Sequence, residues 1–132
     1  MKKIEAIIRE EKLSDVKEAL RELGIVGMNI LEVRGHGRQG GITLVGRTET
    51  YQVDLLPKVQ INIILSDHNV ERTITTICEA GRTGEAGRTG EAGDGMIFVY
   101  PVEQVIRIRT GERNHEALMY PGDIDTRPQT PK

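Results

Sequence analysis

The sequence predicts an α+β fold of the ferredoxin-like type. In this fold two βαβ halves form one antiparallel four-stranded sheet, and both helices cover the same face. Two observations lead to it. Apolar residues alternate along 2–9 and again from residue 59, as strands require, and after each run the apolar spacing becomes helical. A length of 132 residues fits one domain with a single core.

The first half reads as strand, helix and strand. Residues 2–9 carry Ile4, Ala6 and Ile8 on one face, which predicts a strand. We expect Ser14 to cap the following helix and Gly24 to end it in a left-handed turn. The buried stripe of that helix is Leu13, Val16, Leu20 and Leu23. The second strand is predicted over residues 28–34.

The stretch from 35 to 50 is rich in glycine and shows no apolar periodicity. It is too long for a hairpin turn, so we expect an exposed loop. Structureless loops of this length are uncommon in compact domains and are usually functional.

The second half repeats the pattern. A strand is predicted from near Tyr51 to Leu65, kinked at Pro57. Asp67 is the expected cap of a second helix, whose buried stripe is Val70, Ile74 and Ile77.

The chain after the second helix is read in three parts. Residues 96–100 form a short strand, and residues 102–109 form a turn and a further strand end. The sequence after Leu118 contains three prolines and no periodicity, so 1–118 is expected to be the domain and 119–132 a mobile tail.

Composition excludes several classes of protein. The formal net charge is −2, whereas a general duplex-binding protein needs a basic excess, and three Tyr and one Phe are too few rings for stacking on single strands. No nucleic-acid partner is therefore expected. One cysteine excludes an internal disulfide, and no Cys/His cluster has zinc spacing. The apolar runs are too short to span a bilayer, and the composition predicts a cytoplasmic protein.

No catalytic constellation is apparent, so we expect a protein that is not an enzyme. The stretch from Gly35 to Gly41 could instead bind an anion through backbone N–H groups, with Arg38 among them; an ordinary flexible loop is the alternative. Gly93-Asp-Gly95 suits a ribose contact or a plain tight turn.

Two basic features also suit an anion. Arg107 and Arg109 share one face of a predicted strand, on which Ile106 and Ile108 point to the core. They hold an anion between them or face solvent. Lys58, fixed by Pro57, is positioned to meet a carboxylate or protects a sheet edge.

A tandem repeat lengthens the glycine-rich loop 81–95. The six residues of 81–86 recur unchanged as 87–92. The repeat is too short and too polar for a solenoid. It is either a duplication that lengthens a surface loop, which loop entropy tolerates, or a longer anion-gripping loop.

Together these motifs resemble the PII nitrogen-regulatory signal proteins over residues 1–118. The residues that carry the resemblance are Met1-Lys-Lys-Ile-Glu-Ala-Ile-Ile8, Gly37-Arg-Gln39, Tyr51, Leu56-Pro-Lys-Val59, Gly93-Asp-Gly95, Ile97-Phe-Val99 and Val105-Ile-Arg-Ile-Arg-Thr-Gly-Glu112.

The resemblance implies a homotrimer that binds ATP or ADP in clefts between subunits. Self-association would also bury the second sheet face, on which Ile7 and Ile64 are expected. By position, these two residues lie on the adenine side, and Gly35, Gly37 and Arg38 lie near the phosphates. The neighbouring subunit would contribute Gly93, Asp94, Gly95, Arg107 and Arg109.

The resemblance also implies a 2-oxoglutarate site beside Mg-ATP. Gln39 would help to hold both the Mg²⁺ and the keto acid, backbone of Gly37, Gly40 and Gly41 would cradle the keto acid, and Lys58 would pair with its distal carboxylate. The loop 37–50 would be the effector arm. It would control an ammonium channel, nitrogen-assimilation enzymes or their transcription, and it would meet a membrane only through a partner protein.

Some positions depart from the family pattern. Met96 stands where a lysine is common, and Arg82 or Arg88 is a candidate replacement for its charge. Tyr51 occupies a position uridylylated in enteric relatives; an aromatic residue that packs or touches a partner is the alternative.

Other roles stay open at this point. One is a nitrogenase-associated PII relative that inhibits its enzyme by contact. The others, on a similar fold, are a trimeric metal-tolerance protein or an amino-acid sensor.

Overall fold

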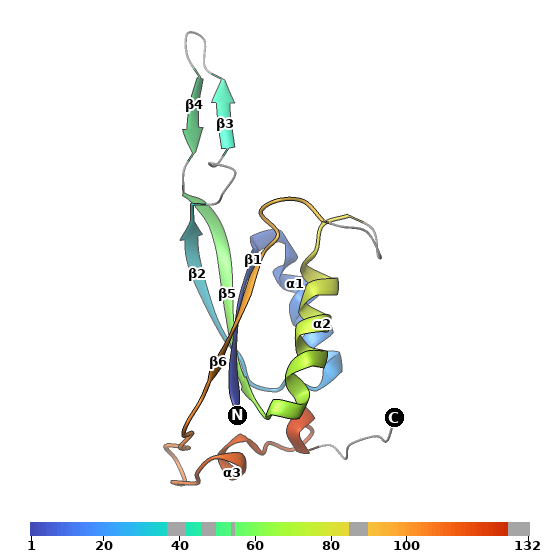
Figure 1. Ribbon diagram of the computed structural model, residues 1–132, viewed down its shortest axis with the longest axis vertical. Helices are drawn as coiled ribbons and strands as arrows, with labels where there is room; N and C mark the ends of the chain where they lie inside the picture. Colours follow the sequence, from blue (N-terminus) through green and yellow to red (C-terminus); the bar gives the residue numbers. More distant parts are fainter. Residues whose placement is uncertain (37–41, 46–49, 54, 85–89, 127–132) are drawn as a thin grey trace.

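The computed structural model describes residues 1–36, 42–45, 50–53, 55–84 and 90–126, with backbone only for 42–45 and 50–53. Its central sheet has the strand order β2-β5-β1-β6. These strands are β1 (Lys2–Arg9), β2 (Asn29–Gly35), β5 (Leu56–Leu65) and β6 (Gly95–Pro101), and every neighbouring pair is antiparallel. The helices α1 (Leu13–Leu23) and α2 (Val70–Gly81) lie side by side on one face (Figure 1). The predicted ferredoxin-like α+β fold is confirmed.

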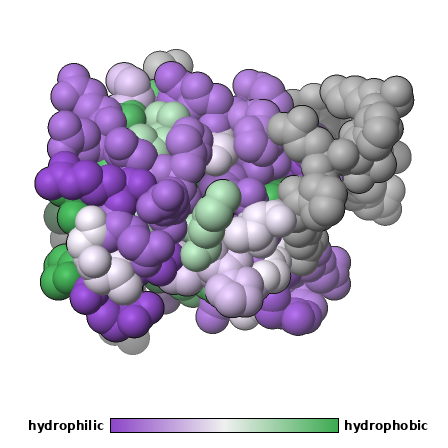
Figure 2. All heavy atoms as spheres, turned by 90° about the horizontal axis from the view of Figure 1, so that it is seen from below, coloured by the Kyte–Doolittle hydropathy of each residue, from purple (hydrophilic) through white to green (hydrophobic). Residues whose placement is uncertain are grey.

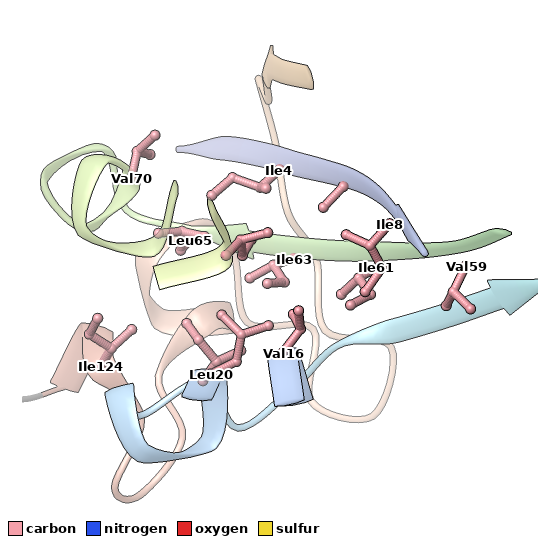
Figure 3. Close-up of a cluster of buried hydrophobic side chains, with 13 residues drawn as sticks. Ile4, Ile8, Val16, Leu20, Val59, Ile61, Ile63, Leu65, Val70 and Ile124 are labelled. Atoms are coloured by element: carbon pink, nitrogen blue, oxygen red, sulfur yellow. The ribbon is translucent and has the colours of Figure 1, made fainter. Parts of the chain in front are cut away.

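The core lies between this helical face and the sheet. The alternation read from the sequence decides it, because every second residue of β1 and β5 points to the helices. Ile4 pairs with Ile63, and Ala6 pairs with Ile61, so buried residues of the two strands meet in register. Val16 and Leu20 of α1 lie against these strands (Figure 3), and Ile77 of α2 belongs to the same buried cluster.

Helix ends follow the prediction at one end only. Gly24 closes α1 with φ 107°, in the left-handed region that favours glycine. The predicted caps Ser14 and Asp67 are wrong. A 3₁₀ turn precedes each helix, Glu10–Lys12 before α1 and Asp67–Asn69 before α2. Because the chain enters each helix through such a turn, the start moves and no side-chain cap forms.

The long glycine-rich segment is not wholly a loop. It contains the antiparallel pair β3 (Ile42–Val45) and β4 (Thr50–Val53), with Ile42 opposite Val53. This hairpin extends beyond the end of the sheet (Figure 1). The predicted strand from Tyr51 is therefore two strands, β4 and β5. Ile42–Val45 is a short β-branched run that pairs locally, and alternation alone did not reveal it.

The C-terminal region differs most from the prediction. Residues 102–109 form no strand; an isolated bridge joins Ile106 to Arg113, and α3 (His115–Leu118) follows. The predicted mobile tail does not hold for its first part, because Ile124 is 2% exposed and belongs to the core. It sits in a short 3₁₀ turn, Ile124–Thr126.

The face of the sheet away from the helices is mixed rather than apolar. Ile7 and Ile64 lie on it, as expected, but Glu5 stands at its centre. The Glu5 carboxylate accepts hydrogen bonds from Gln60 Nε2 (3.1 Å) and from Tyr100 Oη (3.3 Å). In the described part of the chain no helix is long and apolar enough to cross a membrane.

Candidate functional site

A pocket of about 540 Å³ opens where four segments meet at the end of the sheet that carries the hairpin. The strand register explains the convergence. β2 ends and β5 begins with Gly35 opposite Leu56, and β6 begins at Gly95 opposite Ile8, next to the last residue of β1. The lining residues are Ile7, Gly35, His36, Leu56, Lys58, Ala92, Gly93, Gly95, Met96 and Phe98.

Lys58 supplies a positive charge to this pocket. Its Nζ donates a hydrogen bond to the backbone oxygen of Gly93, at 2.5 Å. Partial burial lowers the pKa of Lys58, and the positive charge of Arg9, its cross-strand neighbour, lowers it further. The ammonium group thus has a carbonyl but no carboxylate as its hydrogen-bond acceptor among the described residues. An incoming anion would compensate its charge directly.

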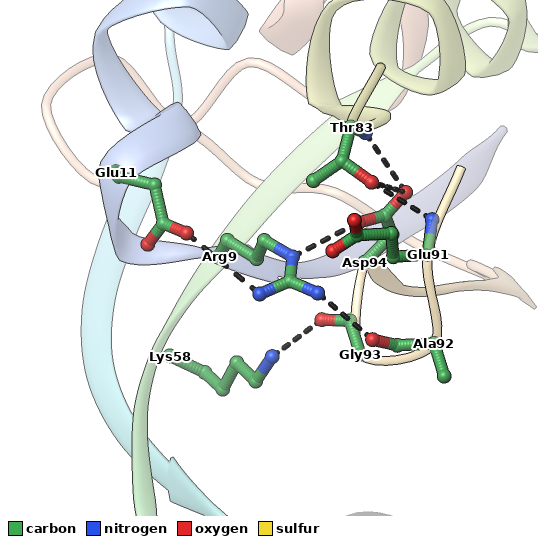
Figure 4. Close-up of polar contacts among 8 residues, drawn as sticks. All are labelled: Arg9, Glu11, Lys58, Thr83, Glu91, Ala92, Gly93 and Asp94. Atoms are coloured by element: carbon green, nitrogen blue, oxygen red, sulfur yellow. Dashed lines mark hydrogen bonds and ion pairs between the residues drawn. The ribbon is translucent and has the colours of Figure 1, made fainter.

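The carboxylate of Asp94 pairs with Arg9, the second cation near the pocket. Arg9 Nε donates to Asp94 Oδ1 at 2.9 Å, and Arg9 Nη2 donates to the oxygen of Ala92 at 2.8 Å (Figure 4). Thr83 donates to Asp94 Oδ2 through its N–H (2.9 Å) and its hydroxyl (3.1 Å). Burial alone would raise the pKa of Asp94, but the bonds from Thr83 and Arg9 outweigh it, so this pKa is lowered.

Thr83 also closes the base of the repeat loop. Its Oγ1 accepts a hydrogen bond from the N–H of Glu91 at 2.8 Å. Thr83 belongs to the first copy of the repeat and Glu91 to the second. The two ends of the loop are therefore joined to each other, to Asp94 and to β1.

Gly95 lets the loop approach β1 closely. A Cβ at this position would lie 1.8 Å from the backbone oxygen of Ile7, and φ is +117°. Only glycine fits. The strand start is thereby held against Ile7, and the backbone of 93–95 borders the pocket.

The predicted site residues do not all lie together. Ile7, Gly35, Lys58, Gly93 and Gly95 line the pocket of one chain, so Gly93–Gly95 need not come from a neighbour. Asp94 turns away to Arg9 and Thr83. Gly37, Arg38, Gln39, Gly40 and Gly41 lie outside the described residues, as does Arg88, and Tyr51 is described only as backbone of β4.

Ile64 and the two arginines lie elsewhere. Ile64 pairs with Lys3, near the opposite end of β1, whereas Ile7 pairs with Gln60. Arg107 and Arg109 follow β6 at that same opposite end, where the N–H of Val102 bonds to the oxygen of Met1. Within one chain the arginines cannot reach the pocket.

The predicted orientation of the arginine pair is wrong. Ile108 is 100% exposed and Ile106 49%, so neither points to the core. Because no strand forms here, Arg107 and Arg109 do not share a strand face. Arg109 is exposed, while Arg107 turns onto its own chain and donates to Glu112 Oε1 at 3.1 Å.

Sequence reasoning missed Arg9 and Thr83. A signal was available for Arg9, since pairing the strongly predicted strands β1 and β5 sets Arg9 opposite Lys58. Two cations facing each other require a nearby negative group. Nothing local in the sequence signalled Thr83, because the repeat contains two identical threonines. No group of three or more metal-binding side chains converges in the part of the chain that is described.

Comparison with known proteins identifies the family of this chain. The family model described as "Nitrogen regulatory protein P-II" matches residues 1–112. Proteins of that name from Pasteurella multocida, Azospirillum brasilense and Nostoc punctiforme are each 52% identical over 118 residues, which is 89% of this chain and 100% of each relative. The chain belongs to the nitrogen regulatory protein P-II family.

Proposed function

We propose that this chain is a nitrogen-regulatory signal protein that binds ATP or ADP, with Mg²⁺, and 2-oxoglutarate in clefts between copies of a homotrimer. It would then act on protein partners through the segment 37–50. An ammonium channel and nitrogen-assimilation enzymes, or their transcription, are the proposed targets. The proposal includes no catalytic turnover.

The observation that carries the proposal is the pocket that gathers Ile7, Gly35, Lys58, Gly93 and Gly95. Apolar side chains there, including Phe98, suit a flat ring such as adenine. The Lys58 ammonium and the glycine backbone suit phosphate or carboxylate oxygens. This chemistry fits a nucleotide with an adjacent organic acid. When bound, Mg²⁺ would neutralise phosphate charge, with Gln39 as its proposed protein ligand.

A second copy is needed to bring Arg107 or Arg109 to such a ligand. Both arginines lie at the end of the sheet opposite the pocket. Ile108, which lies between them in the sequence, is fully exposed, and a large exposed apolar side chain supports packing against another surface. Packing between copies would cover this side chain and bring the arginines of one chain to the pocket of another.

The charges of the site favour binding over reaction. No carboxylate residue is among the described residues that line the pocket, and Asp94, between Gly93 and Gly95, already accepts hydrogen bonds from Arg9 and Thr83. A carboxylate held ionised in this way is a poor general base. Signalling would instead follow from ligand-dependent contacts at Gly35 and Lys58. Gly35 ends β2 and Lys58 lies near the start of β5, and the β3–β4 hairpin lies between these two strands in the sequence.

Isothermal titration tests the proposal. Mg-ATP should bind the wild type, and 2-oxoglutarate should bind only when Mg-ATP is present. Lys58→Met should abolish 2-oxoglutarate binding, while Lys17→Met, at an exposed lysine of α1, should leave it unchanged. A wild type that is indifferent to millimolar ATP and ADP, or that is monomeric, would refute the proposal.

A further inference from the structure

The segment from Ala117 to Thr126, here called the C-terminal strap, is fastened to the core at its far end. The side chain of Ile124 is buried, and its N–H donates to the oxygen of Gly24 at 2.7 Å. Asp123 Oδ2 accepts a bond from the N–H of Val26, at 3.3 Å. The strap thereby covers the turn that follows α1.

Asp125 provides a second attachment. Its carboxylate accepts hydrogen bonds from the N–H of Ser66, at 3.1 Å, and from Asn69 Nδ2, at 2.6 Å. Both donors lie where β5 passes into α2. The strap is thus anchored at two separate points of the domain, although the family match ends at residue 112.

The near end of the strap holds Arg107. Its Nη2 donates to the backbone oxygens of Ala117 and Met119, both at 3.0 Å. The ring of Tyr120 lies against the guanidinium, with its centroid 4.6 Å from Cζ. With Glu112 as counter-ion, the Arg107 side chain is only 16% exposed.

This arrangement leaves one strong donor unused. Arg107 Nε is buried and has no hydrogen-bond partner among the described residues. An unpartnered buried donor destabilises the state that contains it. The strapped state is therefore one that a competing anion, offering acceptors to the whole guanidinium, can displace.

We propose that the C-terminal strap is an autoinhibitory contact: it withholds Arg107 from the anionic ligand of a neighbouring copy, and ligand binding releases Arg107 from Tyr120 and the strap carbonyls. This inference rests on the proposed function, because it assigns the regulation of that same site. The apparent affinity for the ligand then equals the affinity of the released state multiplied by the fraction of chains in that state. Mostly hydrophilic residues surround this end of the molecule (Figure 2), which suits an arginine that leaves the strap for an anion.

Titration of Mg-ATP into matched variants tests the strap. Tyr120→Ala removes the ring but keeps both anchors, and it should bind Mg-ATP roughly three- to tenfold more tightly. Tyr120→Phe keeps the ring face and should match the wild type. A chain ending at Leu118 should bind more tightly too, while a chain ending at Thr126 keeps the strap and should not.

Hydrogen exchange gives a second readout that does not depend on the variants folding well. In the wild type, saturating Mg-ATP should speed exchange at the Met119 and Asp123 amides, which bond to the oxygens of Glu116 and Tyr120. The strap proposal is overturned if Tyr120→Ala binds equally or more weakly, or if exchange at both amides does not respond. If neither the wild type nor any variant binds Mg-ATP, the proposed function fails as well. Equal binding by all refutes the strap alone.

Discussion

Arg9 and Asp94 lie 85 positions apart in the chain and form an ion pair of 2.9 Å between Nε and Oδ1. Each side chain is 20% exposed. The pair fastens the loop before β6 to the end of β1, and Thr83 holds the other oxygen of the same carboxylate. The backbone of 93–95 is therefore held beside the pocket independently of the length that the repeat adds to the loop.

Replacing Asp94 with Asn should lower the free energy of unfolding by about 1–3 kcal/mol. The reason is that Arg9 and Thr83 would lose a charged, partly buried hydrogen-bond acceptor. Glu18→Gln is the matched control. Its carboxylate pairs with Arg21 on the exposed surface of α1, where solvent screens the ion pair, so its loss should be clearly smaller. Urea unfolding measures both variants. Equal losses would show that the Arg9–Asp94 pair does not stabilise the loop.

The same pair should make stability depend on acid pH. The pKa of Asp94 is lowered from its ordinary 3.8 in the folded chain, so its contribution is complete above that value. The contribution is lost as the pH falls from there through the folded pKa. The difference in unfolding free energy between wild type and Asp94→Asn should stay constant between about pH 5 and 7 and shrink below about pH 4. A difference that grows toward acid would contradict this assignment.

The sequence was sufficient for the sheet and its helices. Alternation in β1 and β5 and the helical stripe of α1 report the burial of each face directly, and burial is what decides these elements. The C-terminal strap was not predictable in this way. Asp123, Ile124 and Asp125 are anchored by groups far away in the chain, such as Gly24 and Ser66, and a three-residue turn has no period to detect.

The candidate site was predicted in part for a similar reason. The open backbone of glycine and the ammonium charge of Lys58 follow from residue type alone, so the glycine-bearing loops and this lysine could be named from the sequence. The pairing of Arg9 with Asp94 depends on strand register, and the turn of Arg107 onto Glu112 depends on the chain not forming a strand there. Neither is a property of a local sequence window.

Gly95→Ala should destabilise the fold severely, by about 3 kcal/mol or more, because Cβ would meet the backbone oxygen of Ile7 and φ is positive. Gly27→Ala is the control, since no atom lies within 4 Å of the added Cβ. It should change stability by less than about 0.5 kcal/mol. Thermal unfolding of both variants gives the comparison. A tolerated Gly95→Ala would mean that the start of β6 does not approach β1 this closely.

Ile124→Ala tests whether the strap is part of the core. Removing a buried isoleucine side chain lowers the unfolding free energy by about 2–5 kcal/mol. Met119→Ala, at an apolar residue of the same segment that is 51% exposed, should have an effect below about 0.5 kcal/mol. Chemical denaturation measures both losses. If Ile124→Ala were as mild as Met119→Ala, residues 119–126 would be the mobile tail that composition suggests.

Mixed oligomers test whether two copies complete one site. Lys58 lies in the pocket, and Arg109 follows β6 at the opposite end of the sheet, so each ligand would need Lys58 from one copy and Arg109 from another. Homotrimers of Lys58→Met and of Arg109→Ala should each bind Mg-ATP with 2-oxoglutarate weakly. Trimers assembled from an equal mixture should regain full affinity at about one quarter of their sites, because in a cyclic head-to-tail arrangement that fraction of interfaces pairs two intact halves. Arg113→Ala, mixed with Lys58→Met in the same way, is the control for the loss of a nearby charge. Homotrimers of Arg113→Ala alone should bind normally. Calorimetric stoichiometry distinguishes the outcomes. No recovery in the mixture would mean that both residues act within one chain or that Arg109 takes no part.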